Sequence, residues 1–275
     1  MNDAAAPSNP QASKHEASNS RELSNKVPAV TLFFWVIKIL CTTVGETAAD
    51  FLNANLHLGL TGTTAVMGAL LIVALVFQMR ARTYIPTVYW LVVVLLSVVG
   101  TLITDNLSDN FNVPLLNTTF IFSVALAITF AAWYATERTL SIHLIHTTRR
   151  ESFYWLAILF TFALGTAGGD LVAEKYNVGY LPALAIFWGA IAIVAAAHFL
   201  FKLNGILTFW IAYILTRPLG ASLGDYLSQP LKAGGLALST EAVNISFLLL
   251  IVCLVMYLTK TRIDALAVDD HRSLN

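Results

Sequence analysis

The chain has 275 residues and a formal net charge of zero at pH 7, with 57% hydrophobic and 12% charged residues. A soluble domain carries about 25% charged residues, so this composition excludes an ordinary soluble domain. The balanced charge gives no indication of nucleic-acid binding. We therefore predict an all-α integral membrane protein with the lipid bilayer as its first partner.

Both ends of the chain are polar. Residues 1–27 are rich in Ser, Asn and Pro and lack the apolar core of a secretory signal peptide. We predict that they form a disordered cytoplasmic tail, and that residues 261–275 form a second cytoplasmic tail. The region between them, residues 28–260, is the predicted membrane domain.

Eight apolar segments follow one another through that region, and each is about long enough to cross ~30 Å of hydrocarbon. We place the predicted transmembrane helices near residues 29–52, 60–79, 88–108, 117–136, 153–173, 180–201, 207–228 and 240–258. An even number of spans puts both ends of the chain on the same side of the membrane.

Cationic residues are concentrated on one side of the predicted spans. That side carries Lys14, Arg21, Lys26, Arg80, Arg82, Arg138, Arg149, Arg150, Lys202, Lys260 and Arg262. The opposite loops contain only Lys175 and Lys232. The positive-inside rule therefore predicts that both termini lie in the cytoplasm.

A three-residue pattern recurs four times along the chain. Each copy has a tryptophan, a glycine ten residues later and an aspartate fifteen residues after the tryptophan. The copies are Trp35, Gly45 and Asp50; Trp90, Gly100 and Asp105; Trp155, Gly165 and Asp170; and Trp210, Gly220 and Asp225. Each copy spans two predicted helices, which gives repeats of about 28–82, 83–138, 150–202 and 203–260. Such repeats enter the membrane in the same direction, so we expect the four aspartates at one depth.

The phrases "VTLFFWVIKIL", "GTAGGD" and "FWIAYILTRPLGASLGD" within these repeats resemble a bacterial four-repeat membrane-protein family. This family is known as domain of unknown function 347, or uncharacterised membrane-anchored proteins. The resemblance covers about residues 27–260. It implies the fold and a location in the bacterial cytoplasmic (inner) membrane, and it supplies no chemistry.

A polar stripe that always ends in an aspartate lies on one face of the first helix of each repeat. Positions three, seven, eleven and fifteen after the tryptophan are spaced i, i+4 and fall in one stripe. The predicted substrate- or ion-binding residues are Glu46, Asp50, Asp105, Asp170, Asp225, Lys38 and Arg217. Five carboxylates against two cations require protons or a bound cation for neutralisation. Oxygen ligands suit hard divalent ions, and the metal ligands would be Glu46, Asp105, Asp170 and Asp225.

Small residues form a second stripe on the same helices, the pattern that lets membrane helices approach closely. The predicted packing residues are Gly45, Gly100, Gly165, Gly169, Gly220 and Gly224. The tryptophans begin these helices, where amphipathic rings favour the membrane–water interface. We therefore predict Trp35, Trp90, Trp155 and Trp210 to be interface anchors.

These observations favour a secondary transporter of a cation such as a divalent, Mn²⁺-like metal. A proton-coupled carrier of a small organic solute remains open, with Arg217 and Lys38 binding an anionic group. So does a non-transporting scaffold or sensory subunit, in which the aspartates only cap helices. No catalytic motif is present, so neither an enzyme nor a cofactor is expected.

Cys41 and Cys253 lie in apolar segments and indicate no disulfide framework. The sequence predicts no particular oligomeric state.

Overall fold

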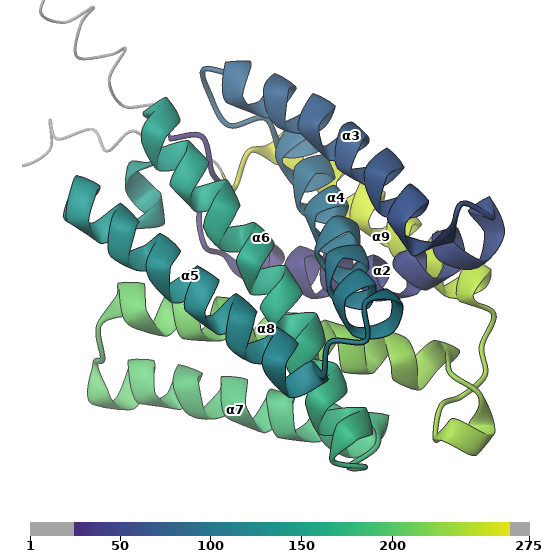
Figure 1. The fold of residues 1–275 in the computed structure, drawn as a ribbon. Coiled ribbons are helices and arrows are strands. Elements are labelled where there is room, and N and C mark those ends of the chain that lie inside the picture. Colours follow the sequence, from purple (N-terminus) through teal and green to yellow (C-terminus); the bar gives the residue numbers. More distant parts are fainter. Residues whose placement is uncertain (1–24, 265–275) are drawn as a thin grey trace, which may run out of the picture.

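A computed structural model describes residues 25–264, and within this range the chain forms eight long helices and no strand (Figure 1). They are α2 (Leu32–Leu56), α3 (Gly59–Arg80), α4 (Pro86–Asp105), α5 (Leu115–Glu137), α6 (Thr148–Asp170), α7 (Tyr180–Phe201), α8 (Gly205–Ser228) and α9 (Thr240–Thr261). Each is long and apolar enough to cross a membrane. The predicted all-α, eight-span fold is confirmed.

Four short helical segments complete the fold. Two are π-helices, η1 (Asn106–Asn110) and η3 (Leu171–Lys175), which continue α4 and α6 directly after Asp105 and Asp170. Two are 3₁₀-helices in connecting loops, η2 (Ile142–Leu144) and η4 (Leu231–Ala233). Short π-helical turns are rare and often lie at functional sites.

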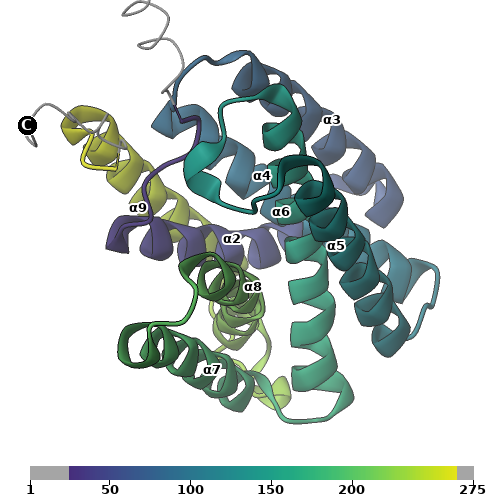
Figure 2. The ribbon, with the colours of Figure 1, turned by 90° about the vertical axis from the view of Figure 1, so that its left-hand side faces the viewer.

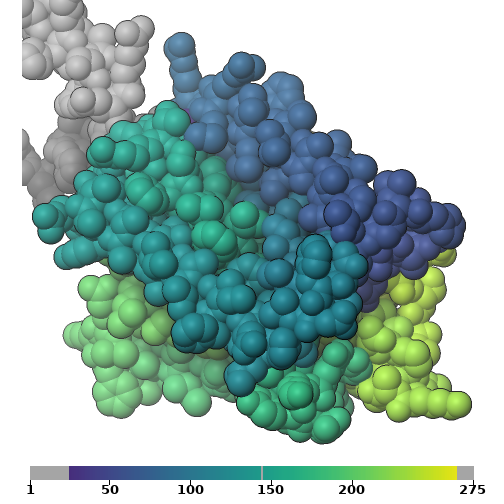
Figure 3. Space-filling view, viewed as in Figure 1, coloured from purple at the N-terminus to yellow at the C-terminus, as the bar shows by residue number. Residues whose placement is uncertain are grey.

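The first helices of the four repeats form a closed ring at the centre of the protein. In these ring helices, α2, α4, α6 and α8, each packs against the next, and α8 returns to pack against α2 (Figure 2). In their most apolar windows, 56–67% of the residues are buried. For α3, α5, α7 and α9 the share is at most 28%. We therefore call these four the outer helices, and their side chains form much of the face seen in Figure 3.

Each outer helix packs mainly against the ring helix of the next repeat. Thus α3 packs on α4, α5 on α6, α7 on α8, and α9 on α2. Helices α2 and α3, which belong to one repeat in sequence, contact each other much less. The packing unit is therefore shifted by one helix from the sequence unit, so the last helix of the chain completes the environment of the first.

One glycine from each repeat lies where two ring helices meet. A β-carbon added to any of the four would overlap the side chain seven residues after the tryptophan of the next repeat. The glycine contacts are Gly45 with Ser97, Gly100 with Phe162, Gly165 with Arg217, and Gly220 with Thr42. The distance from the added β-carbon to the nearest atom ranges from 1.8 to 2.8 Å, which is too short for any non-bonded carbon atom. Close approach of the backbones therefore requires glycine at all four contacts.

More room surrounds the other two predicted packing glycines, Gly169 and Gly224. A β-carbon at Gly169 would lie 3.5 Å from Pro218 Cβ, and one at Gly224 would lie 3.2 Å from Thr47 Cγ2. The first distance is an ordinary van der Waals contact, and the second would require the neighbour to shift by a few tenths of an ångström. The strictest steric demand is therefore at the position ten residues after each tryptophan.

Aromatic pairs fill the end of the ring at which the ring helices begin, and we call this end the tryptophan end. Each tryptophan meets the preceding aromatic residue, with centroids 5.0–5.2 Å apart and steeply inclined rings. Trp90, Trp155 and Trp210 are at most 4% exposed. Trp210 donates a hydrogen bond from Nε1 to the carbonyl oxygen of Leu140 at 3.0 Å. The prediction that Trp90, Trp155 and Trp210 are interface anchors is therefore wrong, because these three rings pack inside the protein. Trp35 is only partly buried.

A buried tyrosine pair at this end gives a test of the packing. The hydroxyl groups of Tyr89 and Tyr154 are 2.5 Å apart, and both side chains are buried. We expect Tyr89→Phe to lower the free energy of unfolding by about 1–3 kcal/mol, because the Tyr154 hydroxyl loses its partner. The double change Tyr89→Phe with Tyr154→Phe should recover most of that loss. Unfolding in detergent, followed by tryptophan fluorescence, measures both; a double variant less stable than the single one would contradict the pairing.

The predicted tails need shorter boundaries. Residues 1–24 and 265–275 lie outside the described residues, so the predictions for them stay predictions. Lys26 and Val27 are buried, although they were assigned to the disordered tail. Asp264, assigned to the second tail, is also buried and accepts a hydrogen bond from the Tyr84 hydroxyl at 2.6 Å. Burial raises the pKa of Asp264, and the Tyr84 hydrogen bond partly opposes this shift.

Candidate functional site

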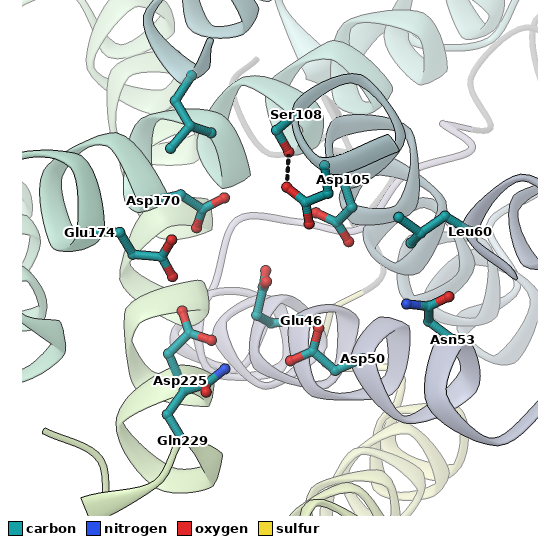
Figure 4. Close-up of a pocket in the computed structure, with 12 residues that line it drawn as sticks. Glu46, Asp50, Asn53, Leu60, Asp105, Ser108, Asp170, Glu174, Asp225 and Gln229 are labelled. Atoms are coloured by element: carbon teal, nitrogen blue, oxygen red, sulfur yellow. Dashed lines mark hydrogen bonds between the residues drawn. The ribbon is translucent and has the colours of Figure 1, made fainter. Parts of the chain in front are cut away.

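A cavity of about 210 Å³ lies between the ring helices where they reach the aspartates (Figure 4). We call this the aspartate end of the protein. Its lining is Glu46, Asp50, Asn53, Leu60, Asp105, Ser108, Asp109, Leu115, Asp170, Glu174, Asp225 and Gln229. Seven of these twelve side chains are carboxylates, and the others are mostly neutral and polar.

The four repeated aspartates all line this cavity, one from each ring helix. They share the position fifteen residues after the tryptophan, so equivalent positions in the ring bring them to the same end. Glu46 lies one helical turn before Asp50 and points toward the same space (Figure 4). The structure thus brings together all five carboxylates selected from the sequence.

Two cavity carboxylates were missed in the sequence. Asp109 and Glu174 follow Asp105 and Asp170 by four residues and belong to the π-helices η1 and η3. The predicted spans ended at residues 108 and 173, which placed both side chains in or next to loops. Their i, i+4 spacing from a repeated aspartate was the signal that could have found them.

Arg217 is fully buried and reaches the cavity through Glu46, which lines it. Its Nη2 donates hydrogen bonds to Glu46 Oε2 at 2.9 Å, to Thr166 Oγ1 at 2.7 Å and to Thr101 Oγ1. Glu46, Thr101 and Thr166 occupy the same position in the first three repeats, eleven residues after the tryptophan. One guanidinium from the fourth repeat therefore contacts the equivalent residue of the other three.

The surroundings of Arg217 fix its position. Its Nη1 donates to the carbonyl oxygen of Thr42 at 3.1 Å. A β-carbon at residue 165 would lie 2.3 Å from Arg217 Cγ, so Gly165 provides the space for the arginine stem. Helix α8 continues through Pro218, directly after the arginine. The guanidinium is thus held by contacts to several ring helices.

Three carboxylates form the tightest acidic group in the cavity. Oxygen atoms of Glu46, Asp170 and Asp225 lie within 4.8 Å of one another. Asp225 is 6% exposed, and its carboxylate has no hydrogen bond or ion pair with any residue between 25 and 264. A buried carboxylate without a partner is costly unless a cation or a proton neutralises it. Oxygen-only ligands of this kind suit hard divalent cations.

Lys38, also predicted as a binding residue, does not line the cavity. It is buried nearer the tryptophan end, where its Nζ donates to the carbonyl oxygen of Tyr213 at 3.0 Å and to Thr216 Oγ1. The ammonium nitrogen also lies 3.8 Å from the centroid of the Tyr213 ring, a cation–π contact. Arg217 is therefore the cation that meets the carboxylates, and Lys38 belongs to the packed region beneath it.

The fourfold pattern is also recognised by a family model. The model described as Repeat of Unknown Function (DUF347) matches residues 33–84, 88–139, 153–204 and 208–264. The chain belongs to the DUF347 family. No curated protein and no solved structure matches it.

The DUF347 repeats fit the structure helix by helix. Each match begins at or near the start of a ring helix and extends just beyond the outer helix that follows it. One DUF347 repeat therefore supplies one aspartate to the cavity and one glycine to the ring. A cavity with four aspartates requires all four copies, while Arg217 and Glu46 distinguish the fourth and first copies from the rest.

Proposed function

We propose that this DUF347 protein is a secondary membrane carrier of a small cation, with a divalent metal such as Mn²⁺ as the first candidate. One observation supports this most strongly: seven carboxylates from all four repeats line one cavity. In the described part of the chain, Arg217 is the only cationic residue that forms an ion pair with any of them.

The charge of the cavity favours a cation over other small solutes. With every carboxylate ionised, seven negative charges face a single guanidinium, and clefts lined by one sign of charge concentrate counter-ions. A divalent ion neutralises two carboxylates at once, which a monovalent ion of the same size cannot do. Protons compete for the same oxygens, so the cavity is suited to exchange between a metal ion and protons.

Arg217 acts in this proposal as an internal counter-charge. It shares Glu46 with the three-carboxylate group, since Glu46 Oε2 accepts its hydrogen bond. An ion that binds Glu46, Asp170 and Asp225 therefore competes with the guanidinium for one carboxylate. When the ion leaves, Arg217 again neutralises Glu46, which limits the cost of an empty cavity.

We propose further that the aspartate end faces outward from a bacterial cytoplasmic membrane. Most cationic residues at the helix ends and in the connecting loops lie at the tryptophan end, namely Arg80, Arg82, Arg138, Arg149, Arg150 and Lys202, whereas Lys175 and Lys232 lie at the aspartate end. This is the distribution that the positive-inside rule expects if the tryptophan end is cytoplasmic. Residues 29 and 264 also meet at this end, where the amide of Ala29 donates to the carbonyl oxygen of Asp264 at 2.7 Å. Both termini would then be cytoplasmic.

The test is Mn²⁺ binding and uptake by the purified protein. We expect Asp225→Asn and Asp170→Asn each to weaken Mn²⁺ binding about 100-fold or more, because loss of an outer partner alone costs 10–100-fold. Calorimetry in detergent measures binding, and proteoliposomes loaded with a Mn²⁺-quenched dye measure uptake. Mn²⁺ should also raise the thermal midpoint of the parent protein and not that of the variants.

A matched control comes from the other end of the protein. Glu137→Gln changes a carboxylate that pairs with Arg149 and Arg150 and ends helix α5, whereas the cavity residue Leu115 begins that helix, so binding should be unchanged. If the parent protein binds no Mn²⁺, or if both aspartate variants bind it as the parent does, the metal proposal is wrong. Loss of thermal stability without any change in flux would instead favour the scaffold.

A further inference from the structure

Residues 25–31 run across the tryptophan end of the ring, and we call this segment the strap. Helix α2 begins at Leu32, immediately after it. In the ring order α2, α4, α6, α8, helix α6 lies diagonally opposite α2. The strap joins these two helices, because Lys26 pairs with Glu151 at the start of α6. Figure 2 shows the strap rising from α2 beside the loop that precedes α6.

The Lys26–Glu151 pair is short and buried. Lys26 Nζ lies 2.6 Å from Glu151 Oε2 and also donates to the carbonyl oxygen of Met79 at 3.0 Å. The second carboxylate oxygen accepts from Gln78 Nε2 at 3.2 Å and from Trp155 Nε1 at 3.5 Å. Glu151 is fully buried. Both charged groups therefore have more than one partner, from the strap, α3 and α6.

Further hydrogen bonds tie the strap to two loops. The amide of Lys26 donates to the carbonyl oxygen of Ile145 at 3.0 Å, and the amide of Ile145 donates to Asn25 Oδ1 at 3.0 Å. Asn25 Nδ2 donates to the carbonyl oxygen of Ile142 at 3.2 Å. The bond from Ala29 to Asp264 joins the segment after α9. The strap is thus fixed to the chain after α5 and after α9 by polar contacts, which water can replace.

The two ends of the ring therefore differ. The aspartate end opens into the acidic cavity, whereas the tryptophan end is filled by aromatic pairs and crossed by the strap. A carrier must expose its site to each side of the membrane in turn. An exit toward the tryptophan end requires the strap to leave its place across the ring.

We propose that the strap is the gate at the tryptophan end and that the Lys26–Glu151 pair is its latch. That the gate serves transport rests on the proposed carrier function. The closed position of the strap rests only on the contacts described above. Separating a buried ion pair is unfavourable while the surroundings stay dry, and becomes easier once water reaches both charges. Such a pair gives two distinct arrangements, closed and dry or open and wet.

The gate is tested by the accessibility of a cysteine placed beneath it. In a Cys41→Ala, Cys253→Ser background, Val93→Cys introduces a thiol at a buried position on α4, three residues after Trp90. The latch is removed by Lys26→Met together with Glu151→Gln, which leaves no lone buried charge. A membrane-impermeant maleimide is applied separately to inside-out vesicles and to spheroplasts.

We expect labelling from one side only, at a rate about tenfold above that of the parent with an intact latch. The matched control is Arg149→Gln, which breaks an exposed ion pair at the same end and should leave labelling unchanged. Unchanged labelling in a folded latch variant, or an equal rise in the control, overturns the proposal. This readout needs no metal, so it stands even if the protein binds no Mn²⁺.

A second variant decides the matter if the latch variant does not fold. Asn25→Cys with Ile145→Cys allows a reducible bifunctional reagent to join the strap to the loop that it contacts. We expect the cross-link to stop Mn²⁺ uptake while Mn²⁺ binding persists, and reduction to restore uptake. Uptake that continues through a complete cross-link overturns the gate. Absence of both uptake and binding before cross-linking is instead a failure of the carrier proposal.

Discussion

Replacing Gly220 by alanine is expected to lower the free energy of unfolding by about 2–3 kcal/mol, the upper part of the ~1–3 kcal/mol range found for overpacked interiors. The added β-carbon would lie 1.9 Å from Thr42 Oγ1 and 3.0 Å from the backbone nitrogen of Thr43. The backbone atom cannot rotate away, so α8 and α2 must separate. Because this contact closes the ring, we also expect weaker Mn²⁺ binding. Chemical unfolding in mild detergent measures the stability.

Two other glycines provide matched controls for this change. A β-carbon at Gly169 finds its nearest neighbour at 3.5 Å, and at Gly68 on α3 nothing lies within 4 Å. Alanine is favoured over glycine inside helices, so Gly68→Ala should be neutral or slightly stabilising. If Gly220→Ala were as harmless as these two, the close approach of α8 and α2 would be disproved.

Arg217→Met is expected to cost about 3–5 kcal/mol, since breaking a buried ion pair leaves an uncompensated charge. Glu46 would lose its cationic partner, and Thr101 and Thr166 would lose a donor. The measurement is again the free energy of unfolding in detergent. Added Mn²⁺ should recover part of the loss, because the ion can replace the missing charge beside Glu46.

The control for this prediction removes both charges of the ion pair, so that Glu46 is not left as an unpaired carboxylate. Arg217→Met combined with Glu46→Gln should be clearly more stable than Arg217→Met alone, because no lone carboxylate remains. Arg149→Met, which removes an exposed partner of Glu137, should cost less than about 1 kcal/mol. Equal stability of the parent and Arg217→Met would show that the ion pair between the guanidinium and Glu46 does not stabilise the fold.

The spans were predictable from the length of the apolar segments, and the repeat and the convergence of the aspartates were predictable from sequence spacing. A pattern of tryptophan, glycine and aspartate at constant offsets requires equivalent positions in equivalent helices. The aspartates therefore had to reach one depth. The glycine ten residues after each tryptophan follows from the same spacing, since small residues mark close helix contacts in membranes.

The partners of each helix were not predictable in the same way. Lipid tails are as apolar as leucine, so hydropathy cannot distinguish a side chain in lipid from one packed against another helix. For this reason the tryptophans were assigned to the interface, although three of them are buried. Lys38 was predicted to be a binding residue, but it does not line the cavity, and its partners are a carbonyl, a hydroxyl and an aromatic ring.

The outermost part of the cavity was missed for another reason. Hydropathy marks the end of a span where polar residues begin, whereas η1 and η3 carry the helical path past that point. A change from α-helical to π-helical hydrogen bonding leaves no clear trace in composition. Asp109 and Glu174 therefore read as loop residues, although the backbone directs both toward the aspartates.

The shifted packing of the outer helices also bears on how the protein is made. Among the helices of the described residues 25–264, α2 is synthesised first and α9 last, yet these two pack together. Until α8 and α9 have been synthesised, α2 lacks both of these neighbours, and Lys38 and Glu46 lack the partners that α8 supplies. A chain truncated before its final hairpin should therefore expose these charges to lipid and be a target for membrane quality control.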